Sequence, residues 1–311
     1  MGGILFSFLM ALSAQAQFRP AAEGLLSNSL NPALADAVVK VVATNPDGLP
    51  MQCTGAYISD QGHILTGSHC LELALFGRPV LDPAADQNLL KLEVNDRVGE
   101  WRVRLISPCR RPDIVASLPE EMALVSIRDC EYYDLAILEP TRPQSVPVCL
   151  EVFQAALPEG EVFTLGYPIR TFRLREPNSM GDQVYYSSGE LGASAVCKIV
   201  ASPSVQRVGH SFSLDQALDR ANQENAVQAS LDVVAGNSGG PVFDKKTGTP
   251  VAVVSFATTA NHFDPRRERC EAGGSFITSL QHLPRAFKVW SPKENWADFV
   301  KATACNARRA K

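Results

Sequence analysis

Short segments with the alternation of half-buried β-strands recur along this chain, and they constrain its fold more than any other feature. Leu90, Leu92 and Val94 alternate with charged residues, which is the period that places successive side chains on opposite faces of a sheet. A second alternating segment, 101–105, follows after a short connection, so the two predict a hairpin. Strands at such short spacing, separated by polar turns, predict an all-β protein. Further strands are predicted over residues 37–42, 51–58, 63–66, 135–138, 162–165, 184–187, 194–200, 226–234 and 250–257.

Two segments have helical spacing instead. Apolar residues at intervals of three and four within 214–221 predict a short inserted helix. Ser291 and Glu294 have the spacing of a capping box with proline at the first helical position, and an apolar stripe follows them. We therefore predict a C-terminal helix within 291–311. Residues 141–160, rich in proline and small side chains, are interpreted as the crossing between two halves of the chain.

Composition and charge exclude one class of partner. The 311 residues suffice for one large domain or two small ones, and 45% hydrophobic with 20% charged residues is typical of globular protein. The net charge of −4 is spread without long runs of one sign. The basic footprint of a nucleic-acid-binding protein is missing, so no nucleic-acid partner is expected.

The N-terminus has the features of an export signal. Residues 1–16 contain no charged side chain and carry an apolar run followed by Ala14-Gln15-Ala16, which fits a small-residue cleavage site. The apolar run, 4–12, is too short to span a bilayer. We predict a signal peptide over 1–16, removed before Gln17, no membrane span, and a mature protein in the periplasm or outside the cell. Residues 17–36 are predicted to be a loose lead-in.

The eight cysteines point to disulfides. An even number in an exported chain, without any C-x-x-C pair, favours four disulfides over a metal site. Cys109 and Cys130 stand at the two ends of a long excursion that must return to neighbouring strands, so we predict that they are paired. The histidines also lack metal-ligand spacing. No metal and no cofactor are therefore expected.

Three separated motifs carry the chemistry. Ser238 lies between glycines after an apolar run, where a nucleophile can stand beside backbone N–H donors. His69 comes earlier, in Thr66-Gly67-Ser68-His69-Cys70, and Asp134 precedes a predicted buried strand. Alone, each residue is as common in a turn, a helix cap or a packed core. Together they predict a nucleophile, a general base and an acid that orients the base.

The order His69, Asp134, Ser238 and the motif Gly-Asn-Ser-Gly-Gly-Pro at 236–241 resemble the chymotrypsin-like serine proteases over residues 37–305. The resemblance implies two antiparallel six-stranded β-barrels, the first over 37–150 and the second over 151–290, with a C-terminal helix. It also implies that the backbone N–H groups of Gly236 and Ser238 form the oxyanion hole. Gly166-Tyr167-Pro168 is similar to the bacterial glutamyl-endopeptidase and HtrA-like branches, although no PDZ module follows.

A second acid competes with Asp134 for the triad. Asp113 lies at a plausible distance from His69 in the sequence. It follows Arg110-Arg111-Pro112, a loop-like setting, whereas Asp134 precedes the stronger strand. Asp134 is therefore the predicted triad acid.

The resemblance also bears on activation and specificity. Asn237 replaces the aspartate that receives a freed N-terminal amine in digestive-type members, so activation by insertion of a new N-terminus is not expected. Asp232 stands where trypsin-like members place the acid that selects Arg or Lys, but bacterial members carry Asp there without that specificity. Glutamyl-specific members have histidine where Val254 stands, which disfavours acidic substrates. The remaining substrate-binding residues implied by the resemblance are Ser255, Phe256, Ala257 and Gly274.

The family also suggests disulfide pairings. Members with cysteines at the positions of Cys53 and Cys70 join them, which locks the loop that carries the histidine. Cys149 resembles a crossover cysteine that reaches the C-terminal segment in some members. This favours the pairs Cys149–Cys305 and Cys197–Cys270 among the three pairings open to these four cysteines.

The sequence thus predicts a secreted serine endopeptidase that acts on protein or peptide substrates through an acyl-enzyme. Cleavage after Arg or Lys is the predicted preference. Two alternatives use the same residues: a catalytically silent protease homologue that binds a protein partner, and an esterase. The sequence leaves the oligomeric state open.

Overall fold

The structure is a computed structural model of the chain. It describes residues 19–44, 48, 50–72, 89–106, 133–152, 156–169, 183–191, 226–231, 233, 235–257, 275–291 and 293–305. The predicted signal peptide, the strand at 194–200 and the helix at 214–221 lie outside these residues. No helix in the described ranges is both long enough and apolar enough to cross a membrane.

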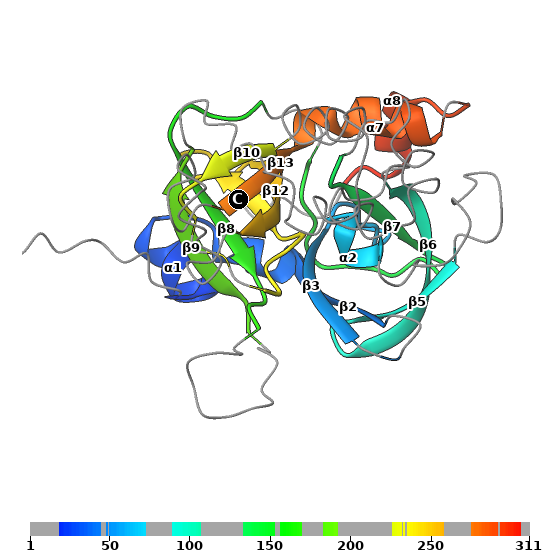
Figure 1. Cartoon of the computed structure of the whole chain (residues 1–311), viewed down its shortest axis with the longest axis horizontal. Coiled ribbons are helices and arrows are strands. Elements are labelled where there is room, and N and C mark those ends of the chain that lie inside the picture. The colour runs from blue at the N-terminus through cyan, green and yellow to red at the C-terminus, as the bar shows by residue number, and fades with distance from the viewer. Residues whose placement is uncertain are drawn as a thin grey trace, which may run out of the picture.

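The first half of the chain forms a closed antiparallel barrel in the order β2-β3-β4-β7-β6-β5 (Figure 1, right). Pairing of β2 with β5 as well as with β3 closes it. The alternation read in the sequence is present in β5, where Leu90, Leu92 and Val94 are buried. The strands are β2 (Val38–Thr44), β3 (Pro50–Tyr57), β4 (Ile64–Thr66), β5 (Leu89–Val94), β6 (Arg97–Ile106) and β7 (Ala136–Pro140).

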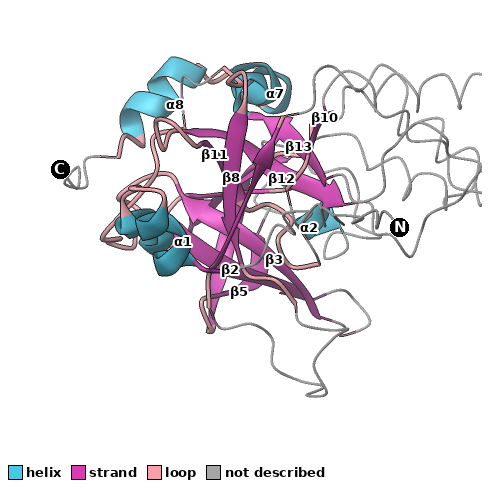
Figure 2. Cartoon of the chain, turned by 90° about the vertical axis from the view of Figure 1, so that its left-hand side faces the viewer, coloured by secondary structure: helices cyan, strands magenta, loops and turns pink. Residues whose placement is uncertain are grey.

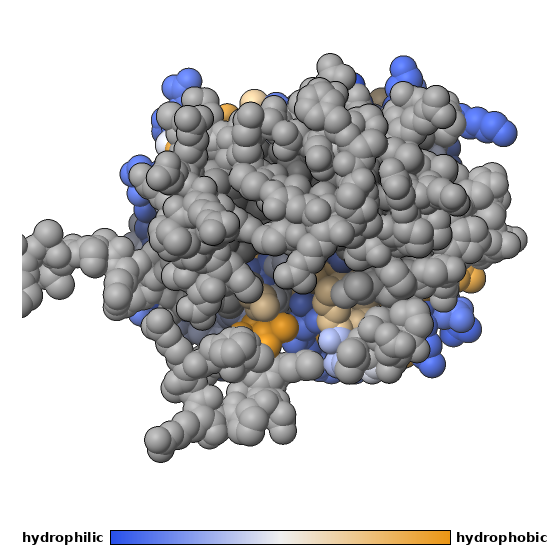
Figure 3. Space-filling model, viewed as in Figure 1, coloured by the Kyte–Doolittle hydropathy of each residue, from blue (hydrophilic) through white to orange (hydrophobic). Residues whose placement is uncertain are grey.

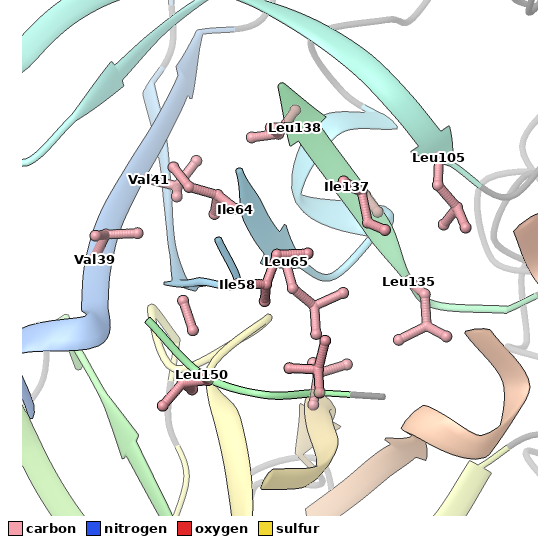
Figure 4. Packing of buried hydrophobic residues seen from close by; sticks show 14 of the residues in the cluster. Val39, Val41, Ile58, Ile64, Leu65, Leu105, Leu135, Ile137, Leu138 and Leu150 are labelled. Carbon is pink, nitrogen blue, oxygen red and sulfur yellow. The ribbon is translucent and has the colours of Figure 1, made fainter. Parts of the chain in front are cut away.

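Branched aliphatic side chains fill this barrel. Val39 and Val41 from β2 and Ile64 from β4 belong to one buried cluster with Leu105 from β6 and Ile137 from β7 (Figure 4). Burying one such side chain contributes about 1.5–3 kcal/mol. The cluster therefore gives the loops at the edge of the barrel a rigid support.

Six strands of the second half, together with β1 from the N-terminal segment, form a seven-stranded antiparallel sheet in the order β1-β9-β8-β11-β12-β13-β10 (Figure 1, left). A bridge between Leu191, just after β9, and Ala229 in β10 joins two strands from opposite sides of this sheet, which curls it round. The predicted all-β, trypsin-like class is confirmed. The strands are β1 (Arg19–Pro20), β8 (Glu161–Gly166), β9 (Tyr185–Glu190), β10 (Ala226–Ala229), β11 (Pro241–Asp244), β12 (Pro250–Ala257) and β13 (Ser275–Ser279).

The predicted loose lead-in has regular structure, so that prediction is corrected. After β1 it forms α1 (Ala21–Ser27) and the 3-10 helix η1 (Pro32–Ala37). Ala21, Gly24 and Leu25 lie on one face of α1 and are buried, which is the spacing of an amphipathic helix. A Cβ at Gly24 would lie 2.4 Å from Cγ of Tyr186. The glycine therefore lets the helix lie close against β9.

The C-terminal helix begins later than predicted. The structure has η4 (Leu280–His282), α7 (Leu283–Trp290) and then α8 (Trp296–Ala302). Ser291 does not cap α8, because its backbone N–H closes the end of α7 on the carbonyl of Phe287 (2.7 Å). Asn295 is the N-cap instead and accepts a hydrogen bond from Ala297 N at 2.8 Å. Both residue types cap helices well, and Asn295 is the one directly before the buried stripe.

The segment with α8 packs against the first barrel, although it follows the second sheet in the chain (Figures 1 and 2, top). The rings of Phe299 and the buried His63 are nearly perpendicular, with a centroid distance of 5.8 Å. Arg104 Nη2 of β6 donates to Glu294 Oε2 at 2.6 Å. Cys149 and Cys305 form a disulfide with a Cα–Cα distance of 5.8 Å. The second half of the chain is thus tied back to the first.

The visible described surface in Figure 3 is mostly hydrophilic around the outline of the molecule. Among the residues whose positions are described, three large hydrophobic side chains are exposed, Leu26, Leu89 and Val98. They come from α1, β5 and β6 and so belong to separate elements.

Candidate active site

The β3–β4 hairpin presents His69 where the two halves of the molecule meet. Gly62 takes φ +92° in its turn, a conformation that favours glycine. The chain leaves β4 through Gly67 and Ser68, and His69 opens the short helix α2 (His69–Glu72). A disulfide between Cys53 of β3 and Cys70 of α2 joins the two ends of this hairpin, with a Cα–Cα distance of 6.0 Å.

His69 and Asp134 form a buried pair. His69 Nδ1 lies 2.7 Å from Asp134 Oδ2 and 2.9 Å from Oδ1, and the His69 backbone N–H donates to Oδ1 at 3.0 Å. Because an ionised carboxylate only accepts hydrogen bonds, Nδ1 carries a proton in this contact, and in the neutral imidazole Nε2 then has the lone pair. This is the tautomer in which Nε2 can take a proton from a neighbouring group.

Two serine hydroxyls complete the surroundings of Asp134. Ser68 Oγ donates to Oδ1 at 3.1 Å, and Ser255 Oγ of β12 donates to Oδ2. Sequence reasoning placed Ser255 only at the substrate strand and gave Ser68 no role. Adjacency to His69 was the one signal for Ser68. For Ser255 no local signal existed, because its contact with Asp134 joins the two halves of the molecule.

The pKa of Asp134 reflects opposing effects. Burial of the carboxyl alone would raise its pKa. The charge of His69, the hydrogen bonds from the His69 ring and from Ser255, and the His69 backbone N–H lower it, and they hold the pKa well below the ordinary range of an aspartate. Asp134 is therefore ionised at neutral pH.

The loop that carries Ser238 (residues 235–240, the serine loop) lies directly against the loop that carries His69 (residues 66–69, the histidine loop). Gly239 has φ +78°, and a Cβ there would lie 2.2 Å from Thr66 Oγ1 and 2.6 Å from Gly67 N. Cys70 Sγ lies 3.7 Å from the carbonyl oxygen of Ser238 and 3.8 Å from His69 Nε2. Ser238 is thus beside the pair, and its side chain is partly exposed. Within the described ranges no hydrogen bond links Ser238 Oγ to His69 Nε2.

Two backbone N–H donors of the serine loop, those of Gly236 and Ser238, flank Asn237. Gly236 has φ +93°, and a Cβ there would lie 2.3 Å from the carbonyl oxygen of Tyr167, so only glycine fits without displacement. Among the residues described, no acceptor takes a hydrogen bond from the N–H of Gly236 or of Ser238. Two backbone N–H groups flanking a serine can hold a negatively charged oxygen.

Not every predicted site residue is placed. Ser255, Phe256 and Ala257 lie on β12, which pairs with β13 through a register shift between Val254 and Phe256. The other predicted site residues and disulfide cysteines lie outside the described residues, namely Asp232, Gly274, Cys109, Cys130, Cys197 and Cys270, together with the rival acid Asp113.

One group of side chains in the described ranges has the types that bind metal ions. It consists of Cys53, His69 and Cys70. The two sulfurs are bonded to each other, whereas a cysteine binds a metal as the thiolate. His69 is then the one side chain of this group able to bind a metal ion, and its Nδ1 is already hydrogen-bonded to Asp134.

The chain is similar to known peptidases in sequence and in fold. The family model described as "Trypsin-like peptidase domain" matches residues 53–253. A search of the curated proteins found no match. Solved structures that resemble the chain include the HtrA-type protease AlgW with a tripeptide, at 14% identity and a TM-score of 0.48, with 88% of this chain and 65% of that chain covered. Another is the serine endoprotease from Yersinia pestis, at 14% identity and a TM-score of 0.46, with 89% and 69% covered. The chain thus spans about two thirds of the length of these proteins.

Proposed function

The chain belongs to the trypsin-like peptidase domain family, and from this premise we propose that it is an exported serine endopeptidase with the triad Ser238, His69 and Asp134. The observation that carries the proposal is the buried His69–Asp134 pair with the Ser238 loop packed against it. Acyl transfer needs a nucleophile beside a base that a third group orients, and the contact between these loops supports that assignment.

The reaction begins at Ser238. Its hydroxyl is a weak nucleophile, so His69 Nε2 removes the proton while Oγ attacks the carbonyl carbon of the scissile peptide bond. The hydrogen bond between Ser238 and His69 forms when substrate is bound, since such contacts are often long in the free enzyme. Asp134 keeps the proton on Nδ1 and stabilises the imidazolium. His69 then gives its proton to the leaving amine, and water hydrolyses the acyl-enzyme by the same route.

Negative charge on the substrate oxygen develops as Oγ attacks. We assign its stabilisation to the N–H groups of Gly236 and Ser238, which have no acceptor among the described residues. One such donor contributes a factor of about 10²–10³ to kcat in enzymes of this type.

Substrate class and destination follow from the sequence. The substrate is a protein or peptide that lies along β12 beside Ser255, and Asp232 would select Arg or Lys at the cleaved bond by charge pairing. The signal peptide would direct export and be removed before Gln17, which is tested by sequencing the N-terminus of the protein recovered outside the cytoplasm. An N-terminus other than Gln17, or retention in the cytoplasm, contradicts this part of the proposal.

The test of the activity is labelling of the mature protein with a fluorophosphonate probe, followed by cleavage profiling on a peptide library. The wild type should be labelled, and Ser238→Ala should not, with both folded by circular dichroism. An unlabelled wild type would mean a silent homologue that binds a protein partner. Labelling with hydrolysis of small esters but of no peptide would identify an esterase. Peptide cleavage without preference for Arg or Lys removes the role given to Asp232.

A further inference from the structure

Four consecutive carbonyl groups of the serine loop, those of residues 235–238, accept hydrogen bonds. The carbonyl of Ala235 accepts from Ile169 N at 2.7 Å and that of Asn237 accepts from Gly240 N at 2.9 Å. In a trans peptide unit the N–H points opposite to the preceding C=O. Anchoring these two carbonyls therefore directs the N–H groups of Gly236 and Ser238 to the opposite side, where the substrate oxygen would lie.

The carbonyls of Gly236 and Ser238, which alternate with those of Ala235 and Asn237, are both held by one residue, Thr54. Thr54 of β3 donates through its hydroxyl to the carbonyl of Gly236 at 2.7 Å and through its backbone N–H to the carbonyl of Ser238 at 2.8 Å. Thr54 has no exposed surface, and its strand, β3, is paired on both sides, with β2 and with β4. The loop is thus fastened to the first barrel at two points, on either side of Asn237.

Thr54 also contacts the segment that holds the carbonyl of Ala235. Its hydroxyl oxygen accepts from Tyr167 N at 2.9 Å, and Tyr167 lies two residues before Ile169, the residue that holds the carbonyl of Ala235. The Thr54 carbonyl accepts from Thr66 Oγ1 at 2.7 Å, and Thr66 begins the loop that leads to His69. Thr54 therefore connects the serine loop and the segment after β8 through its hydroxyl, and the histidine loop through its backbone carbonyl.

We propose that Thr54 is a positioning residue that holds the N–H groups of Gly236 and Ser238 in place for the developing oxyanion. The proposal rests on the proposed function, since it gives these donors a role in the reaction. The hydroxyl is required because it donates to one carbonyl and accepts from one N–H at the same time, which a purely apolar side chain of the same shape does not. Loss of the hydroxyl removes both hydrogen bonds and leaves the buried carbonyl of Gly236 without this donor, so the loop can then rotate.

The test compares Thr54→Val with Thr54→Ser. Valine keeps the volume and the backbone bond to Ser238 but removes the hydroxyl, whereas serine restores it. Thr164→Val is the matched control, because Thr164 is also a buried strand threonine whose hydroxyl donates to a nearby carbonyl, that of Pro241, at 2.9 Å. All variants are checked for folding by circular dichroism and thermal unfolding.

We expect Thr54→Val to lower kcat on a peptide substrate by about 10- to 100-fold with KM nearly unchanged, since the lost alignment acts on the transition state. Affinity for a peptide boronate, which forms a tetrahedral adduct on Ser238, should fall in parallel. Thr54→Ser should recover kcat to within about threefold, and Thr164→Val should keep wild-type kcat. Wild-type kcat in Thr54→Val, an equal loss in Thr164→Val, or no recovery in Thr54→Ser overturns the proposal.

Hydrogen exchange separates this proposal from the proposed function. The N–H of Gly239 donates to the carbonyl of Val254 at 2.7 Å, so its exchange reports on the loop even in an inactive protein. Faster exchange by about tenfold or more in Thr54→Val than in Thr164→Val supports the positioning role. Equal exchange in the two variants overturns it, whether or not the wild type reacts with the fluorophosphonate.

Discussion

Replacing Gly239 by alanine should be among the most damaging single changes in this protein. The added methyl group would lie 2.2 Å from Thr66 Oγ1, 2.4 Å from the carbonyl oxygen of Thr54 and 2.6 Å from Gly67 N. Two of these three atoms belong to the backbone and cannot rotate away. The contact joins the serine loop to the histidine loop, so relief of the clash must separate the two.

The cost has three physical parts. A non-glycine residue at φ +78° loses about 1–2 kcal/mol relative to its preferred conformation. Forcing an extra methyl into a packed site costs about 1–3 kcal/mol. Displacement of Thr66 breaks its hydroxyl bond to the Thr54 carbonyl, which costs about 1 kcal/mol. The sum predicts a loss of about 4 kcal/mol in the free energy of unfolding.

Gly248→Ala provides the matched control. Gly248 has a similar φ of +68°, but the nearest atom to an added Cβ is Leu34 Cδ1 at 3.8 Å, an ordinary van der Waals contact. This variant should lose only the conformational part, about 1–2 kcal/mol. The difference between the two variants isolates the steric cost.

Urea unfolding of both variants measures these values, and fluorophosphonate labelling reports on the site. Gly239→Ala should be both less stable than Gly248→Ala by about 2–3 kcal/mol and unlabelled, whereas Gly248→Ala should be labelled like the wild type. Equal stability of the two variants, with normal labelling of Gly239→Ala, would refute the close approach of the two loops.

Three further predictions address charge, covalent structure and metal independence. Ser255→Ala removes a donor from buried Asp134 and should cost about 2 kcal/mol at neutral pH, against about 1 kcal/mol at any pH for Ser275→Ala, which loses a bond to a neutral carbonyl. The pKa of Asp134 is depressed in the folded state, so the stabilisation from its ionised form is present above the ordinary pKa of 3.8 and is lost as the pH falls below that value. The stability difference between Ser255→Ala and the wild type, measured in urea titrations, should therefore shrink in that acidic range. A difference that stays constant with pH would contradict this prediction. Replacing Cys149 and Cys305 together by serine opens a link that spans 156 positions and should cost up to about 5 kcal/mol in non-reducing unfolding experiments; an unchanged midpoint would show that packing alone holds α8. EDTA should leave fluorophosphonate labelling unaffected, because the proposed reaction uses no metal, and labelling restored by added zinc would contradict this.

Local pattern predicted much of the first barrel and several parts of the site. The hairpin before His69, the strand after Asp134 and the glycines around Ser238 each have a signature within a few residues. The α7 helix and the start of α8 were missed, because Ser291 and Asn295 are both good N-caps and local spacing does not decide between them. Tertiary position does: Ser291 already closes α7.

Contacts between the two halves of the molecule could not be predicted from local sequence pattern. Thr54 in a strand has no local mark that its hydroxyl will reach Gly236, since that contact depends on how two separately formed β units dock. Gly24 was interpreted as part of a loose segment, since glycine weakens a helix in isolation, whereas here it permits the approach of Tyr186. Such residues are recognised only once their distant neighbours are known.

The packing of α8 on the first barrel has a consequence for the order in which the protein is made. The strands of that barrel are complete once residue 140 has been synthesised, yet His63 and Arg104 meet Phe299 and Glu294 only when nearly the whole chain is available. The barrel that is synthesised first therefore lacks these contacts until α8 has been made. A chain that stops between the two halves keeps the His63 side of the barrel uncovered, and incompletely packed chains of this kind are prone to aggregation.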